Sequence, residues 1–200
     1  LTINAPEGSD AAFTWEGFQA AVNSDLANVL GNFVNRITRY CASKFDGQVP
    51  EGGTPGEAEA WLFDELKDRL PRLLAHYEAM EFRKAAVETR AIWAAGNEYL
   101  TRAEPWVKYK TDVEGAAIGV RMGLNLAAMF GVIAQPIVPD AAGRILEALG
   151  VPEDQRDFGF DDLEARLARL RPGHAIQPPE VLFQKIEDSQ VADWSARFGG

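Results

Sequence analysis

The chain of 200 residues is 46% hydrophobic and 25% charged, with a formal net charge of −10. This composition predicts one globular core, and the acidic balance argues against proteins that coat a nucleic-acid backbone, because their surfaces are basic. The single cysteine, Cys41, excludes an intrachain disulfide and suits a reducing, cytoplasmic setting.

The first 45 residues predict a connection followed by a long helix. Residues 1–13 are rich in turn-forming residues and are interpreted as a connection from an upstream segment, and the absence of an initial methionine favours a processed or excised piece. Thr14 is a plausible N-cap, and a helix is expected over 15–45, with a bend near Asn23.

Within this helix, the helical repeat separates two faces. One is an apolar stripe: Leu26, Leu30, Phe33, Ile37, Tyr40 and Cys41. The other face carries Asn28, Asn32, Asn35, Arg36 and Arg39. Asparagine forms helices poorly, so this face gives up helix propensity, and no acid occurs from residue 26 to 45. This polar face is either an ordinary solvated surface or a surface whose side chains hydrogen-bond planar groups of a ligand. Asn32 and Arg36 are four residues apart, so their side chains lie over the same patch of the helix surface.

The remaining pattern predicts an all-α bundle of about five main helices. After a turn-rich loop, Thr54 to Glu57 form a capping-box pattern that opens a helix running to about residue 80, which Pro71 is expected to kink or divide. Further helices are expected over 81–102, 111–138 and 140–149, with a shorter one over 161–170. An extended segment over 174–179 leads into an amphipathic tail over 180–198. The expected organisation is a connection over 1–13, a bundle over 14–150 and a tail over 151–200 that packs back on it and ends in a short helix.

The segment between the third and fourth helices contains Pro105 and Trp106, followed by Lys108, Tyr109 and Lys110. Most tryptophans are largely buried, so Trp106 is either a core anchor or an indole that the preceding proline presents to a ligand. An aromatic ring beside cations is typical of proteins that bind single-stranded RNA.

Catalytic and metal-binding groupings are absent from the sequence. The two histidines, His76 and His174, are far apart and have no metal-ligand spacing, and neither a P-loop nor a dinucleotide-binding glycine pattern occurs. The most apolar segment, over 115–138, is interrupted by Arg121 and Asn125, which favours a buried core helix over a membrane span. No catalytic residue, metal or cofactor is therefore assigned to this chain.

Two motifs resemble a known family. The run N-S-D-L-A-N-V-L-G-N-F-V-N-R and the later run N-E-Y-L-T-R-A-E-P-W-V-K are similar to the C-terminal helical domain of bacterial methionyl-tRNA synthetases, which are class I aminoacyl-tRNA synthetases. The resemblance covers essentially the whole chain. It implies recognition of the C-A-U anticodon of methionine tRNA, with Asn32 and Arg36 contacting anticodon bases, Trp106 stacking on the wobble cytosine and Pro105 supporting it.

The family's nucleotide-binding domain, with its H-I-G-H and K-M-S-K-S signatures, is missing from the sequence. The resemblance therefore implies that ATP and methionine bind to a catalytic domain outside this chain, and that this chain alone is inactive. The expected partners are the anticodon loop of methionine tRNA and that catalytic domain, with no DNA or membrane partner. Arg39, Lys108 and Lys110 are candidate phosphate contacts.

Two other classes of function remain open from the residues alone. One is a helical module that docks a protein partner without binding RNA, which the acidic balance suits. The other is an architectural bundle that stiffens a larger enzyme.

Overall fold

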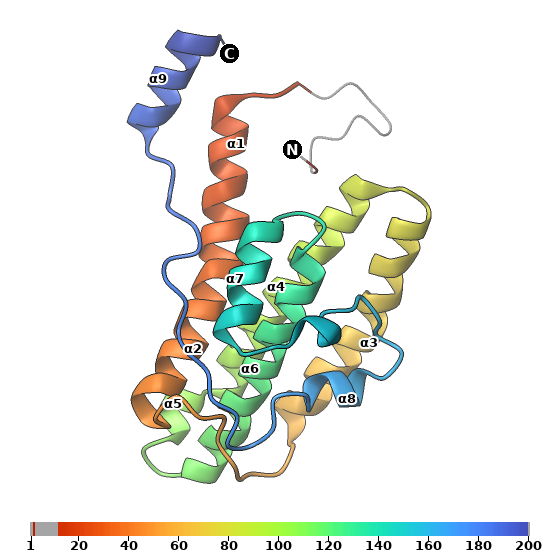
Figure 1. Cartoon of the computed structure of the whole chain (residues 1–200), viewed down its shortest axis with the longest axis vertical. Helices are drawn as coiled ribbons and strands as arrows, with labels where there is room; N and C mark the ends of the chain where they lie inside the picture. Colours follow the sequence, from red (N-terminus) through yellow and green to blue (C-terminus); the bar gives the residue numbers. More distant parts are fainter. Residues whose placement is uncertain (1, 3–11, 200) are drawn as a thin grey trace.

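The computed structural model describes residue 2 and residues 12–199, so most of the expected connection over 1–13 lies outside the described residues. The described chain is an all-α bundle (Figure 1). Its only β-type pairing in this part of the chain is an isolated bridge between Gln48 and Ala175. The expected fold class is therefore confirmed.

The predicted first helix is present as three consecutive segments: α1 (Trp15–Ala21), the π-helical η2 (Val22–Gly31) and α2 (Asn32–Lys44). Thr14 caps α1, since its side-chain oxygen accepts a hydrogen bond from the backbone N–H of Gly17 at 3.0 Å. The winding changes from α-helical to π-helical at Val22, next to the position where a bend was expected. Leu30, Phe33, Ile37 and Cys41 are fully buried, as the apolar stripe predicts.

Helices α3 (Glu57–Glu78) and α4 (Phe82–Ala103) form an adjacent hairpin, and two details of the prediction for α3 are wrong. Its N-cap is Gly56, whose N–H donates to the Glu59 carboxylate at 2.8 Å, so Thr54 and Pro55 precede the helix. Pro71 does not divide the helix. It is exposed, and α3 continues through it.

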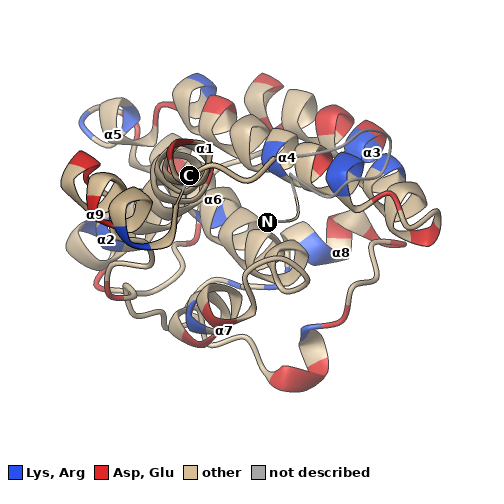
Figure 2. Cartoon of the chain, turned by 90° about the horizontal axis from the view of Figure 1, so that it is seen from above, with Lys and Arg blue, Asp and Glu red and all other residues tan. Residues whose placement is uncertain are grey.

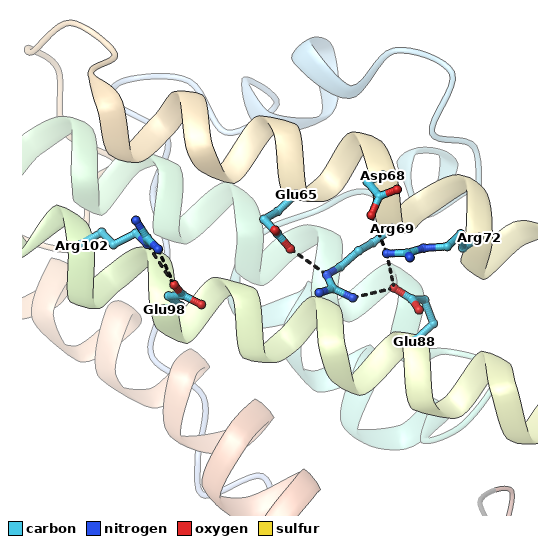
Figure 3. Close-up of polar contacts among 7 residues, drawn as sticks. All are labelled: Glu65, Asp68, Arg69, Arg72, Glu88, Glu98 and Arg102. Atoms are coloured by element: carbon cyan, nitrogen blue, oxygen red, sulfur yellow. Dashed lines mark hydrogen bonds and ion pairs between the residues drawn. The ribbon is translucent and has the colours of Figure 1, made fainter.

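Ion pairs join α3 to α4 along their exposed flank (Figure 3). Arg69 lies 3.0 Å from both Glu65 and Glu88, and Arg72 lies 2.6 Å from Asp68 and 3.6 Å from Glu88. Basic and acidic residues accordingly lie next to one another on α3 (Figure 2). Because carboxylates neutralise these arginines, the flank presents little net positive charge to a ligand.

Helix α6 (Val113–Ala134) is the core of the bundle, preceded by the single turn α5 (Pro105–Lys108). By length and composition α6 could cross a membrane, but 89% of its apolar window is buried inside the protein, as in a core helix. Three of its glycines, at positions 119, 123 and 131, lie against side chains of α5, α2 and α7. Small residues at these points let the neighbouring helices approach closely.

The chain then passes through α7 (Pro139–Ala148), the 3₁₀ turn η3 (Glu153–Gln155) and α8 (Leu163–Leu167). An extended segment runs back along the first helix and ends in α9 (Asp188–Phe198), beside α1 (Figure 1). The predicted tail with a terminal short helix is confirmed, although its helix begins only at Asp188. Along the long axis of the molecule, α5 and α9 lie at opposite ends (Figure 1).

The contact between α4 and α6 yields a stability prediction. A Cβ atom at Gly96 would lie 2.4 Å from the Phe130 ring, which is fully buried and packs on Phe33 at 4.8 Å. We expect Gly96→Ala to lower the free energy of unfolding by about 1–3 kcal/mol, because the two rings have no space to move aside. Urea denaturation of the wild type and the variant measures this difference in the free energy of unfolding.

The matched control is Gly143→Ala in α7, where no heavy atom lies within 4 Å of the added Cβ. This substitution should raise stability by about 0.5–1 kcal/mol, since alanine favours a helix interior. Equal effects of the two substitutions would contradict the packing argument.

Candidate nucleic-acid interface

The polar face of α2 is exposed, as the helical pattern predicts. Asn32, Asn35, Arg36 and Arg39 are exposed, and Asn28 continues this face into η2. The guanidinium of Arg39 donates to the Asn35 amide oxygen at 2.6 Å, which fixes both side chains on one turn. The amide and guanidinium groups thus lie on a surface that a ligand can reach.

The segment with Trp106 forms α5, a helical turn that the sequence analysis treated as a connection. Glu104 ends α4 in the left-handed backbone region, with φ 46°, which redirects the chain before Pro105. Pro105 is the first residue of α5 and is buried, whereas Trp106 is half-buried. Trp106 therefore does not have the complete burial of a core anchor.

Arg36 and Trp106 are in direct contact. The guanidinium carbon of Arg36 lies over the indole ring, 4.5 Å from its centroid, which is a cation–π arrangement. Two residues that the sequence separates by 70 positions are therefore brought together, as expected for one site.

Tyr40 supports this contact from α2. Its ring meets the indole of Trp106 at 5.7 Å and 84°, and its hydroxyl donates to the Pro105 carbonyl at 3.4 Å. Burial, with a smaller contribution from Tyr109, raises the pKa of Tyr40, so the hydroxyl remains a donor at neutral pH. Tyr40 therefore positions α5 against α2.

The aromatic surface extends towards the end of α2. Tyr109 meets Phe45 edge-on at 5.5 Å, donates to the Lys44 carbonyl at 3.3 Å and has the Lys44 ammonium over its ring at 5.5 Å. The Tyr109 ring also meets Tyr40, at 6.2 Å, so the Tyr109 and Phe45 rings and the Lys44 ammonium adjoin the residue that packs on Trp106.

Helix α6 sets the positions of both α2 and α5. A Cβ at Gly119 would lie 3.2 Å from Pro105, and a Cβ at Gly123, one turn later, would lie 2.8 Å from Ile37. Pro105 adjoins Trp106, and Ile37 adjoins Arg36 in the chain. Two glycines on one face of α6 therefore fix the separation of the two interface residues.

Asn32 lies one turn before Arg36, and it lines a groove of about 450 Å³ between the polar face and the returning tail. It therefore shares the exposed face of α2 with Arg36 without belonging to the Arg36–Trp106 contact. Lys108 is half-buried and Lys110 is exposed. Within residues 12–199 no ion pair is formed by Arg36, Arg39, Lys44, Lys108 or Lys110, in contrast to the arginines of α3.

Sequence reasoning missed two contributors to this surface. It assigned Tyr40 to the apolar stripe. The only sign of another role was its hydroxyl, which needs a hydrogen-bond partner when it is buried. It predicted an amphipathic tail over 180–198, but it did not indicate that Phe183 of this tail lies beside Asn32. In the described residues no cluster of three or more His, Cys, Asp or Glu side chains could hold a metal ion.

Comparison with known proteins first identifies the class of domain. The family model described as "Anticodon binding domain of methionyl tRNA ligase" matches residues 49–200, and the model "tRNA synthetases class I (M)" matches residues 1–38. The first match covers most of the chain. The chain therefore belongs to the family of methionyl-tRNA ligase anticodon-binding domains.

Curated relatives agree with this assignment. The chain is 72% identical to a methionine–tRNA ligase of Hyphomonas neptunium and 69% identical to that of Maricaulis maris; each match covers all of this chain and 35% of the relative. The chain thus spans about a third of the length of these relatives.

Among solved structures, the chain is similar to the methionyl-tRNA synthetase of Mycobacterium tuberculosis in its free state, with a TM-score of 0.79 and 29% identity. That match covers 90% of this chain and 36% of the other. The structure of the same synthetase bound by methionyl-adenylate gives a TM-score of 0.78 over 88% of this chain and 35% of the other.

Proposed function

We propose that this chain reads the C-A-U anticodon loop of methionine tRNA for a methionine–tRNA ligase. The observation that carries the proposal is the contact of Arg36 with Trp106 at 4.5 Å, on the face of α2 that also bears Asn32. A planar guanidinium and an indole side by side suit an unstacked base, which stacks on a ring and is hydrogen-bonded along its edge.

In this proposal the wobble cytosine stacks on Trp106. The Arg36 guanidinium now covers one face of that ring, so a base that uses this face displaces the guanidinium. The five N–H donors of Arg36 then turn to acceptors on the base edge or the sugar. Pro105, buried against Gly119, holds the indole in place while this exchange occurs.

Phosphate contacts come from Arg39, Lys108 and Lys110, which form no ion pair within residues 12–199. The rest of the chain is acidic, with a net charge of −10. RNA recognition by this surface therefore depends on base contacts more than on neutralising the backbone. The acidic surface does not favour DNA or a membrane as partner.

The proposal assigns catalysis to a domain outside this chain, where ATP and methionine bind in a cytoplasmic enzyme. Residues 1–13 connect to it, residues 14–150 form the anticodon-binding bundle and residues 151–200 the tail. Anticodon binding accelerates aminoacylation when the cognate contacts strengthen in the transition state, so loss of a contact lowers charging efficiency.

Substitution of Trp106 tests the stacking role. We expect Trp106→Ala in the full ligase to lower kcat/KM for methionine tRNA at least about tenfold, because stacking of one base on a ring contributes about 1–3 kcal/mol. Aminoacylation assays measure the effect. Binding of an anticodon stem-loop to the 200-residue chain should weaken similarly, whereas Trp194→Ala at the opposite end should leave it unchanged. A wild-type charging rate for Trp106→Ala would remove this residue from the site.

Substitution of Arg36 tests base readout. We expect Arg36→Gln to weaken binding of the C-A-U stem-loop more than binding of a stem-loop with a substituted first anticodon base. Glutamine keeps a planar polar group but loses the charge and the guanidinium fork. Equal losses for both stem-loops in a titration would show that Arg36 contacts only the backbone.

Salt dependence tests the number of phosphate contacts. Three cations on a single strand predict a slope of log K against log salt concentration of about −2. Affinities measured across a series of potassium chloride concentrations give this slope. A slope several times steeper would contradict recognition centred on bases.

A further inference from the structure

Half of one sequence motif has no role in the function proposed above. In the run from Asn97 to Lys108, the second half supplies Pro105 and Trp106 to the interface, whereas the first half lies in the last turns of α4. Two polar side chains of this first half are Asn97, which is half-buried, and Tyr99, which is fully buried. Polar groups inside a bundle need hydrogen-bond partners, and these partners show what this half of the motif does.

Asn97 joins the backbones of two helical segments. Its side-chain amide donates to the Val29 carbonyl of η2 at 3.1 Å and to the Trp93 carbonyl, one turn earlier in α4, also at 3.1 Å. The NH₂ group has two donors, one for each carbonyl. Because both acceptors are main-chain atoms, the amide fixes the distance between η2 and α4 themselves.

This bond is one of two that attach the polar face to the segment formed by α4 and α5. Val29 lies three residues before Asn32, and beyond the face the Tyr40 hydroxyl donates to the Pro105 carbonyl at 3.4 Å. Asn32 and Arg36 lie between these two attachments. A helix held at a single point can pivot about it, whereas a helix held on both sides of its functional face keeps one orientation.

The winding of η2 adds to the importance of this attachment. η2 is π-helical and ends where α2 begins, and π-helical winding is rare and recurs at functional sites. Its turns contain more residues than α-helical turns, so the winding before Asn32 sets the direction in which the α2 face points. The bond to the Val29 carbonyl holds this segment against α4 just before the winding changes.

On the opposite side of α4, Tyr99 attaches the helix to α3. Asn97 and Tyr99 are two residues apart, about 200° around the helix, so they point to different neighbours. The Tyr99 hydroxyl donates to the Glu59 carboxylate at 2.6 Å, and the other oxygen of that carboxylate accepts from the Gly56 N–H at 2.8 Å. α3 carries none of the residues proposed to contact RNA. It holds the end of α4 in place, so the bond to Val29 acts from a fixed support.

We propose that Asn97 is a positioning residue for anticodon reading. By holding the Val29 carbonyl, it fixes η2 against α4 and keeps Asn32 and Arg36 where they meet a base stacked on Trp106. In enzymes, a misplacement of about 1 Å caused by a distant substitution can lower efficiency about a hundredfold. The inference rests on the proposed anticodon recognition and adds a residue that acts through the backbone without touching the RNA.

The test compares two substitutions of Asn97 in the 200-residue chain. In Asn97→Ser, the short hydroxyl still bonds to a carbonyl one turn earlier, as the Thr101 hydroxyl does at 3.1 Å, but it does not reach Val29. Asn97→Leu keeps the volume of the side chain and removes both bonds. We expect each variant to weaken binding of the C-A-U stem-loop about fivefold or more, and to weaken binding of a stem-loop with a substituted first anticodon base less.

A double-mutant cycle with Arg36 separates positioning from a general loss of stability. If Asn97 acts through Arg36, Arg36→Gln should weaken binding of the C-A-U stem-loop by a smaller factor in the Asn97→Ser background than in the wild type. Tyr99→Phe is the matched control, because it also removes a side-chain hydrogen bond from α4, but on the side of α3. In that background Arg36→Gln should cost the same factor as in the wild type.

The inference is overturned if Arg36→Gln costs the same factor in the wild-type and Asn97→Ser backgrounds, or if both Asn97 variants weaken the two stem-loops equally. It also fails if Tyr99→Phe changes the effect of Arg36→Gln as much as Asn97→Ser does, because loosening of α4 would then explain both. The single variants Trp106→Ala and Arg36→Gln test the proposed function separately. If both bind the C-A-U stem-loop like the wild type, anticodon recognition at this face fails. If they weaken binding and the Asn97 variants do not, only the positioning role fails.

Discussion

The interface depends on how closely α2 and α5 can approach α6. Gly119 and Gly123 lie one turn apart on α6, and they receive Pro105 from α5 and Ile37 from α2. A Cβ at these glycines would lie 3.2 Å from Pro105 or 2.8 Å from the Ile37 side chain, so Pro105 would have to shift by a few tenths of an ångström and the Ile37 side chain would have to move aside. The packing of α2 and α5 against α6 in the core thus places Arg36 and Trp106 in contact at the surface, at 4.5 Å. A site on the surface is therefore positioned by glycines in the core.

The position of Trp106 is also fixed by its immediate neighbours. Trp106 is held by the buried Pro105 beneath it and by the Tyr40 ring at its side, and the Tyr40 hydroxyl donates to the Pro105 carbonyl. A ring fixed in this way would lose little entropy in the proposed stacking of a base on it. The exposed residues Asn32 and Arg36 are then free to supply hydrogen bonds, because neither has a structural role in the core.

Much of the fold could be predicted from periodicity, because the apolar stripes are long and regular. Helix boundaries were harder to predict than the helices themselves. The predicted cap of α3 was Thr54, whereas the observed cap is Gly56, because the Glu59 carboxylate accepts from the Gly56 N–H. Pro71 was expected to disturb α3, but it faces solvent and the helix continues. Residue chemistry and resemblance singled out Arg36 and Trp106 on separate grounds, and the structure shows that these two side chains are in contact. The groove could not be predicted, since it joins residues 28–39 to residues 179–185 and only the folded tail brings them together.

The pairing of arginines with acids along α3 and α4 has a consequence for how a polyanion approaches. Arg69 and Arg72 are each neutralised by carboxylates within 3.0 Å, while Lys110 near α5 forms no such pair within residues 12–199. In the function proposed above, the acidic body as a whole repels a strand carrying one negative charge per nucleotide, and the unpaired cations near α5 favour its approach to this end. For the proposed RNA partner, this charge distribution favours one orientation of approach before any base is touched.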